Sequence, residues 1–293
     1  MVTILRRGLL TAVLILLAFA VVPVSAFADH SWGNYHWART VNPFRLILVD
    51  NVSSAWDGYL DTALSDWTGS SVLDLAKEPG DPTNLRRCPA ISGRVEVCST
   101  TYGNNGWLGV AQIWISGDHI TQGTVKLNDT YFKTAKYNTD AWKNLVMCQE
   151  VGHTFGLDHQ DETLDNLNLG TCMDYTNYPE GGPQGSFDYG PSNLHPNAHD
   201  SEELGIIYSH VDSTSTVGQT VQNRRGRTPP ALADTDSDEP VQLGTAQWGK
   251  LIRSRNHGRT ELYELDLGRG HKVVTHVIWA EPEEEARPQR WRR

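Results

Sequence analysis

The stretch that decides the fold is QEVGHTFGLDH, residues 149–159. If it continues a helix that begins near residue 139, Gln149 and His153 lie one turn apart on the same face, with Glu150 beside them. Gly156 allows a left-handed turn after the helix, which brings His159 back towards that face. Two imidazoles, an amide oxygen and a carboxylate would then converge on one point.

This convergence suits zinc. Catalytic zinc has about three protein ligands and one open position, and a neighbouring carboxylate can take a proton from zinc-bound water. We therefore expect Gln149, through its side-chain oxygen, His153 and His159 as metal ligands, and Glu150 as the general base. Because an amide is a weaker donor to zinc than imidazole, we expect a lower zinc affinity than that of a three-histidine site.

The same stretch resembles the long zinc motif of the metzincin metalloproteases, and within them the matrixins, with Gln149 in place of the family's first histidine. Residues 172–175, CMDY, resemble the Met-turn that underlies the metal in that clan. The resemblance implies that Met173 is the hydrophobic base of the site. Tyr175 is expected to approach the metal or the transition state.

The resemblance covers roughly residues 40–210. It implies an α+β catalytic domain, built from a twisted mixed sheet, a zinc helix, a Met-turn and a C-terminal helix. Many matrixins also carry an inhibitory propeptide cysteine. Between Asp29 and the first expected strand there is no cysteine, so we expect that latency mechanism to be absent.

Residues 1–28 are typical of a secretory signal peptide. Arg6 and Arg7 precede the apolar run Gly8–Val22, and small residues follow at Ala26 and Ala28. Cleavage after Ala26 is an alternative to cleavage before residue 29, and the run is shorter than the roughly 20 residues of a membrane span. We expect a secreted, extracellular protein with no membrane span after signal removal.

Charge divides the remaining chain in two. Residues 29–212 hold 10 Lys and Arg against 24 Asp and Glu, a net charge of 10 − 24 = −14. Residues 213–293 hold 13 and 11, a net charge of +2. The acidic balance argues against nucleic-acid binding.

The two parts also differ in composition, which predicts the domain organisation. We expect a metzincin-like metallopeptidase domain over residues 29–212 and a disordered linker over 213–240, where large apolar residues are scarce. Residues 241–293 are expected to form a small β-hairpin region, with strands at Leu262–Leu267 and Val273–Trp279, and a charged tail. We expect everything after residue 212 to be dispensable for the main fold.

Periodicity in the main domain predicts both strands and helices. The expected strands are Phe44–Asp50, Val72–Ala76, Gly93–Cys98, Val110–Ile115 and Thr124–Leu127, and the expected helices are Ser53–Trp67, Thr139–Phe155 and Asn197–His210. Ser53 is the expected cap of the first helix and Thr139 or Asn138 that of the second. We expect an extended peptide substrate to pair with an edge strand such as Thr124–Leu127.

Export permits disulfide bonds, and four cysteines allow three pairings. Cys88 and Cys98 flank a short loop, which favours a bond between them. Cys148 precedes Gln149, and Cys172 lies at the start of the Met-turn, so a bond between them would join the helix to that turn.

Two further groups of polar residues have alternative interpretations. Calcium would accept the oxygens of an acidic loop that contains Asp158, Asp161, Glu162, Asp165 and Asn166, but the spacing matches no standard calcium loop and a solvated loop is favoured. His195 and His199 lie four apart, but Pro196 and Asn197 between them favour a role at the helix start and the surface.

The sequence as a whole predicts a monomeric, secreted, zinc-dependent endopeptidase that acts on extended peptides. The alternative is a catalytically inactive protein of the same fold that serves as an extracellular binding module.

Overall fold

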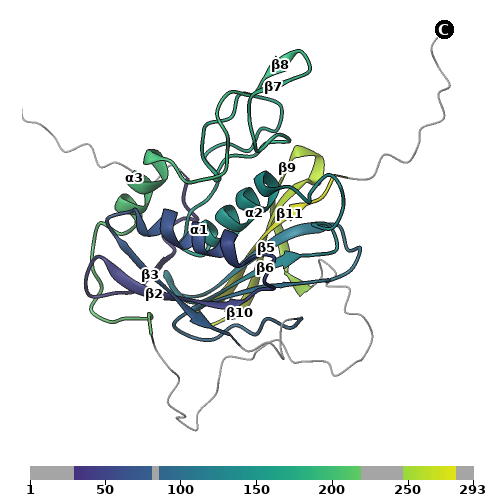
Figure 1. Cartoon of the computed structure of the whole chain (residues 1–293). Coiled ribbons are helices and arrows are strands. Elements are labelled where there is room, and N and C mark those ends of the chain that lie inside the picture. The colour runs from purple at the N-terminus through teal and green to yellow at the C-terminus, as the bar shows by residue number, and fades with distance from the viewer. Residues whose placement is uncertain (1–29, 81–85, 219–246, 282–293) are drawn as a thin grey trace, which may run out of the picture.

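The computed structural model describes residues 30–80, 86–218 and 247–281 (Figure 1). The expected signal peptide, most of the expected linker and the charged end of the chain lie outside these residues. The helices are α1 (Asp57–Thr68), α2 (Asp140–His153) and α3 (Ala198–Ile207). The strands are β1 (His36–Trp37), β2 (Phe44–Asn51), β3 (Leu73–Pro79), β4 (Val95–Thr100), β5 (Trp107–Ser116), β6 (His119–Asn128), β7 (Pro183–Gln184), β8 (Phe187–Asp188), β9 (Lys250–Arg255), β10 (Thr260–Gly268) and β11 (His271–Trp279).

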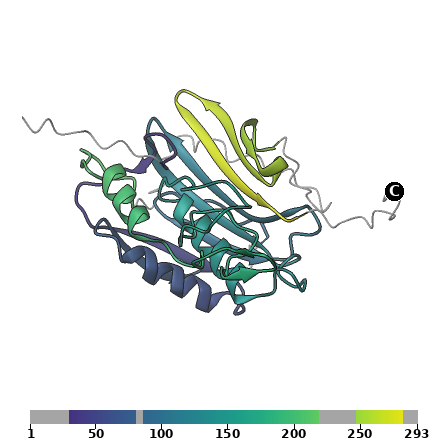
Figure 2. The same cartoon turned by 90° about the horizontal axis from the view of Figure 1, so that it is seen from above.

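One mixed sheet organises the molecule, as the sequence predicted. Its strand order is β3-β2-β4-β6-β5-β11-β10-β9, and β1 pairs with β6. The strands β2, β3, β4 and β6 run parallel, whereas β5 runs antiparallel to β6. Helices α1 and α2 lie side by side on one face of this sheet (Figures 1 and 2). A short hairpin of β7 and β8 interrupts the long loop between α2 and α3.

Local sequence explains the bounds of the helices. The Thr139 side chain accepts a hydrogen bond from the N–H of Trp142 and so caps α2. Gly156 follows the helix with a φ of +94°, and a Cβ there would come within 2.2 Å of the Tyr35 carbonyl oxygen. The expected cap at Ser53 is wrong: α1 begins at Asp57, and the N–H of Ser53 donates to the Ser99 hydroxyl.

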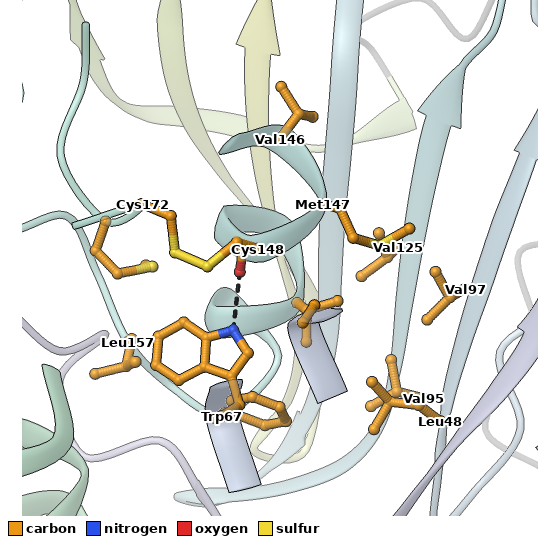
Figure 3. Close-up of a cluster of buried hydrophobic side chains, with 14 of the residues drawn as sticks. Leu48, Trp67, Val95, Val97, Val125, Val146, Met147, Cys148, Leu157 and Cys172 are labelled. Atoms are coloured by element: carbon orange, nitrogen blue, oxygen red, sulfur yellow. Dashed lines mark hydrogen bonds between the residues drawn. A yellow bond between two sulfur atoms is a disulfide. The ribbon is translucent and has the colours of Figure 1, made fainter. Parts of the chain in front are cut away.

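The main core lies between the sheet and helices α1 and α2 (Figure 3). Trp67 of α1 is fully buried, and its indole N–H donates to the carbonyl of Cys148 in α2 at 3.1 Å. Gly152 makes this close packing possible, because a Cβ there would lie 2.6 Å from the Trp67 ring and 2.8 Å from the Met173 sulfur. The packing fixes α2, and the Met-turn below it, relative to the rest of the core.

The region after residue 246 continues the same sheet. Strand β11 pairs antiparallel with β5 from His271 opposite Ser116 to Trp279 opposite Trp107. The structure therefore differs from the expectation of a separable tail, because the predicted hairpin of β10 and β11 gains a partner strand in the main domain. Residues 213–218, which were expected to belong to the linker, also bind the main domain: Thr216 donates its N–H to the Ala38 carbonyl.

A second core forms where this region meets β5. The fully buried side chain of Trp107 packs with Val110 of β5 and with Trp248, Tyr263 and Val277 of the C-terminal region. On the strand pair itself, the Gln112 amide donates to the Thr275 hydroxyl in a buried hydrogen bond of 3.0 Å. The sequence pattern missed β9, in which five of the six residues are exposed and three are charged, as is typical of an edge strand.

The expectation that Thr124–Leu127 is an edge strand is wrong. It belongs to β6, which pairs with β4 on one side and β5 on the other. Its backbone groups are therefore already used within the sheet. Along the sheet path, the outer strands are β3 and β9.

Both predicted disulfides are confirmed, Cys88–Cys98 and Cys148–Cys172. The second joins α2 to the Met-turn, as its position in the sequence implied. Among the described residues, no helix has the length and apolar character needed to cross a membrane.

We predict that a chain ending at residue 246 is strongly destabilised, because it uncovers Trp107 and leaves the β5 edge unpaired. Losing the packing around a buried tryptophan costs roughly 3–5 kcal/mol. Thermal unfolding followed by circular dichroism measures the effect. A chain ending at Glu281 is the matched control and should unfold like the full chain. Equal unfolding temperatures for all three chains would show that the C-terminal strands do not support the fold.

Candidate metal centre

Three histidines converge beside the end of α2. His153 is the last residue of the helix, and His159 returns after the turn at Gly156, as the sequence predicted. The third is His276 of β11. One ring nitrogen from each of the three lies within 4.8 Å of the other two, and the ring centroids are 4.1–4.7 Å apart.

The sheet explains why His276 reaches this point. Alternate residues of a strand face the same side, and Val274 and Ile278, which flank His276 two residues away, are buried in the main core with α2. His276 pairs in register with Ala111 of β5. The pairing of two strands thus brings a residue from the C-terminal region opposite the helix.

The free ring nitrogens fit a metal ion. The Nδ1 atom of His153 lies 2.9 Å from the Leu157 carbonyl oxygen, and this contact directs Nε2 into the cluster. The Nδ1 atom of His159 faces the carboxylate of Glu162 at 3.3 Å. Among the described residues, the Nε2 atoms of both histidines are buried without a hydrogen-bond partner. Two such nitrogens beside a third imidazole form a donor set that zinc prefers.

His276 bridges two groups. Its Nδ1 atom lies 3.3 Å from a carboxylate oxygen of Glu150, and its Nε2 atom lies 2.6 Å from the Tyr175 hydroxyl. A metal ion bound by one of these two nitrogens would replace the contact of that nitrogen with Glu150 or with Tyr175. Burial lowers the pKa of both His276 and His153, and each is lowered further by neighbouring histidines. Both rings are therefore neutral, which is the form that binds a metal.

Glu150 lies within the same cluster and is fully buried. Burial raises the pKa of its carboxyl well above the ordinary value, against the effect of a hydrogen bond from the Ala111 backbone. One carboxylate oxygen has no hydrogen-bond partner among the described residues. Gly109 provides the space, since a Cβ there would lie 2.8 Å from that oxygen. A bound cation would favour the ionised form of this carboxyl.

Met173 lies against α2 and Tyr175 lies beside the histidines, and the roles that the resemblance implied for them stay predictions. The Met173 sulfur packs beneath α2 at Gly152. The Tyr175 ring lies 4.4 Å from the His159 ring, and its hydroxyl contacts His276. Burial raises the pKa of Tyr175 well above its ordinary value, so the hydroxyl keeps its proton.

Gln149 has a different environment from the one expected of a ligand. Its amide nitrogen donates to the Cys172 carbonyl at 2.8 Å, and this bond joins α2 to the Met-turn beside the disulfide. Its amide oxygen is buried and has no partner among the described residues. Gln149 as a metal ligand stays a prediction. His276 is an alternative third ligand, which the sequence did not indicate.

Two carboxylates of the acidic loop after α2 form ion pairs with β9. The Arg253 guanidinium donates to both carboxylate oxygens of Asp158 and lies 3.1 Å from Glu162. Burial alone would raise the pKa of Asp158, but hydrogen bonds from His159 and Arg253 hold it far below the ordinary value. The predicted calcium site remains a prediction, and two of its proposed carboxylates already have an arginine partner.

The centre is closed. His153 and Glu150 are 0% exposed, His276 is 1% exposed, and Tyr175 is 2% exposed. Strand β11 covers one side, and Trp32 stacks on the His153 ring at 4.8 Å on another. A surface pocket between β9 and residues 158–163 reaches His159. In this arrangement an extended peptide has no path to Glu150.

The other candidate histidines lie elsewhere. His195 contacts Asp66 at 2.6 Å, and His199 stacks on His30. Asn197 between them caps α3 through a capping box, as the sequence favoured. Neither histidine belongs to the cluster at α2.

One signal could have identified His276. Residues 273–279 were predicted as a strand, and alternate residues of a strand face the same side, so His276 shares a face with Val274 and Ile278. A histidine on the buried face of a strand needs a polar partner. The sequence did not show that this strand lies beside α2.

Comparisons with known proteins give little support for a family. The sequence matches no protein-family model and no curated protein. Among solved structures, the chain is similar to the structure of myroilysin, with 12% sequence identity over 58% of this chain and 82% of that chain, and a TM-score of 0.32. A similarity this weak supports no conclusion about function.

We predict that Arg253→Met destabilises the protein by about 1–3 kcal/mol, because it leaves the Asp158 carboxylate largely buried without its cation. Chemical denaturation of both forms measures the change. Arg255→Met is the control: Arg255 is more exposed and has one ion pair, with Glu162, so its loss should cost less than about 1 kcal/mol. Equal effects of the two substitutions would contradict this account of the contact.

Proposed function

We propose that this protein is a secreted zinc-dependent endopeptidase whose centre is closed by its own C-terminal strand. The observation that carries the proposal is the pair of buried, unpartnered Nε2 atoms of His153 and His159 beside the buried carboxylate of Glu150. Buried polar atoms are rarely left without partners, and a zinc ion would satisfy both nitrogens. The predicted signal peptide and the two disulfides support export.

In the closed arrangement we assign His153, His159 and His276 as the ligands. Three imidazoles match a catalytic zinc site, and their mutual distances leave room for an ion between them. The amide oxygen of Gln149, near the end of the same helix, has no hydrogen-bond partner within the part of the chain that the structure describes. In the open arrangement, where His276 has left with β11, this oxygen takes the third position.

A zinc ion held here supplies Lewis-acid polarisation of a peptide carbonyl and of a water molecule. Glu150 takes a proton from that water and passes it to the departing amine. The apolar surroundings raise the pKa of this carboxyl, and a bound cation would keep it ionised and so able to accept the proton. The Tyr175 hydroxyl, which keeps its proton, can donate a hydrogen bond to the carbonyl oxygen as negative charge develops.

Substrate access requires β11 to leave β5. Without β11, the backbone groups of β5 from Trp107 to Ser116 form a free strand edge next to Glu150. An extended peptide can add to such an edge as an extra strand. We therefore propose β5, and not β6, as the strand that binds substrate.

We predict that Glu150→Gln retains zinc and the fold but loses peptide cleavage. The amide preserves the shape of the side chain but cannot accept the proton. Zinc content, thermal unfolding and digestion of a peptide library measure the three properties. The substitution is best made together with His276→Ala, which removes the zinc ligand on β11 and so favours release of β11 from the site. Cleavage by the double variant at the rate of His276→Ala alone would refute Glu150 as the base.

We predict opposite effects of His276→Ala on zinc affinity and on cleavage. Zinc affinity should fall by more than the 10–100-fold typical of losing an outer-shell partner, because a ligand is lost. At saturating zinc, cleavage should rise at least about tenfold, because the metal no longer ties β11 to the centre and only the pairing with β5 opposes its release. Gln149→Ala is the control for the closed protein: its zinc affinity should be nearly unchanged.

The outcomes separate the parts of this proposal. If wild type cleaves the library and zinc-loaded His276→Ala does not, the site is a peptidase but β11 belongs to its active form. If neither form cleaves although both bind zinc, the peptidase proposal fails. The second candidate function, a non-catalytic extracellular binding protein, is favoured by the complete burial of the centre and would then stand.

A further inference from the structure

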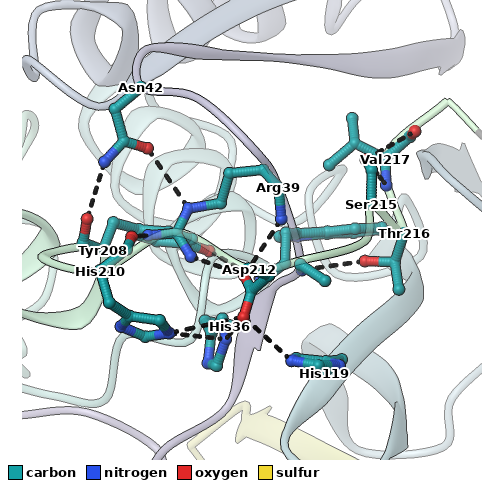
Figure 4. A network of polar contacts seen from close by, with 12 residues as sticks. His36, Arg39, Asn42, His119, Tyr208, His210, Asp212, Ser215, Thr216 and Val217 are labelled. Atoms are coloured by element: carbon teal, nitrogen blue, oxygen red, sulfur yellow. Dashed lines mark hydrogen bonds and ion pairs between the residues drawn. The ribbon is translucent and has the colours of Figure 1, made fainter.

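A second cluster of histidines lies away from α2, where three chain segments meet (Figure 4). His36 belongs to β1, and His119 is the first residue of β6. His210 and Asp212 follow α3. Figure 4 shows the three imidazole rings around the carboxylate of Asp212. Neither the proposed reaction nor the sequence motif uses these residues.

Four distances between the polar atoms of this cluster are close to those of a tetrahedral metal site, and His36, His119 and Asp212 form a group whose ligand atoms lie within 4.8 Å of one another. The Oδ1 atom of Asp212 lies 3.2 Å from the Nε2 atom of His119, 3.5 Å from that of His36 and 3.7 Å from that of His210. The Nε2 atoms of His36 and His210 are 3.2 Å apart. Zinc bonds of about 2.0–2.1 Å in tetrahedral geometry place neighbouring ligand atoms about 3.3–3.4 Å apart. We propose that His36, His119, His210 and Asp212 bind a structural zinc ion.

Surrounding contacts orient these atoms for a metal. The Nδ1 atom of His36 lies 2.6 Å from the Asn34 carbonyl oxygen, which can only accept, so this nitrogen carries the proton and Nε2 keeps its lone pair. The other carboxylate oxygen of Asp212 accepts hydrogen bonds from the guanidinium of Arg39 at 2.9 Å and from its N–H at 3.1 Å. Oδ1 is thereby left to face the histidines. Such outer contacts are typical of metal sites.

Without a cation, hydrogen bonds among its own members can hold the cluster together. The Nε2 atom of His210 lies 3.2 Å from that of His36, and the Nε2 atom of His119 lies 3.2 Å from the Asp212 oxygen. Histidines that are hydrogen-bonded or protonated in this way, with no metal, are the rival explanation. The side chain of His36 is 7% exposed and that of Asp212 is 11% exposed, whereas His119 and His210 are 38% and 52% exposed. The buried pair forms the base of the site, and the exposed pair closes it from the solvent side.

The ion would fasten the start of the described chain to its middle and to the segment after α3. Next to His36, the Trp37 indole donates to the Thr154 carbonyl just after α2. Two residues before His210, the Tyr208 hydroxyl donates to the Phe155 carbonyl. The structural zinc would thus stabilise the segments that hold the turn between His153 and His159.

The test compares zinc content after dialysis in the wild type and in the double variant His119→Ala/His210→Ala. Both substituted side chains are partly exposed, so the fold should be retained. We expect the double variant to lose one zinc per chain and the stabilisation against heat that zinc gives. The control His195→Ala/His257→Ala removes two exposed histidines outside the cluster and should bind as much zinc as the wild type.

A second measurement does not depend on a variant. Zinc titration of the intact protein, followed by ¹⁵N NMR of the histidine rings, should shift the Nε2 signals of His36, His119 and His210. Equal zinc content in wild type and double variant would overturn the proposal. Ring signals that respond to pH but not to zinc would overturn it in favour of protonated histidines. Neither result depends on whether the centre at α2 cleaves peptides.

Discussion

The antiparallel pairing of β11 with β5 is the interaction on which the candidate centre depends. It places His276, from the C-terminal region, opposite two histidines that helix α2 and its following turn supply. The same pairing covers Trp107, and it occupies the edge of β5 opposite the edge that pairs with β6. One set of backbone hydrogen bonds therefore completes the sheet, closes the core and supplies the third imidazole.

Charge complements this pairing. Residues 29–212 carry a net charge of −14, and residues 213–293 carry a net charge of +2. The opposite charges of the two regions meet at Arg253, because its guanidinium binds Asp158 and Glu162 immediately beside His159. The cost of burying neutral histidines and a carboxyl is compensated only in part by these contacts. A zinc ion would supply the missing partner, and so would link metal binding to docking of the C-terminal strands.

Much of the fold could be predicted from local sequence. The period of the apolar residues located strands β2 to β6 and helices α1, α2 and α3, but not the two-residue strands β1, β7 and β8. Gly156 predicted the return of His159 to α2. The positions of Cys148 and Cys172 predicted the bond between the helix and the Met-turn. These features depend on residues close in sequence or on a single motif, so their geometry follows from the backbone.

The rest depends on pairing between distant strands, which local patterns do not encode. The run Val273–Trp279 was identified as a strand, but nothing in it specifies β5 as the neighbour. For that reason the tail was expected to be separable and Thr124–Leu127 was expected to lie at an edge, and the sequence did not indicate His276 as an alternative to Gln149 as the third ligand. The cluster of His36, His119, His210 and Asp212 was missed for the same reason, since its members come from three segments.

The most direct test is a crystal structure of the intact, zinc-loaded protein with anomalous diffraction recorded at the zinc edge. The account predicts an anomalous peak bonded to His153, His159 and His276, with β11 paired to β5 and the Gln149 amide nitrogen on the Cys172 carbonyl. A peak bonded to Gln149 while His276 lies away from the metal, or no peak at this centre, would contradict it.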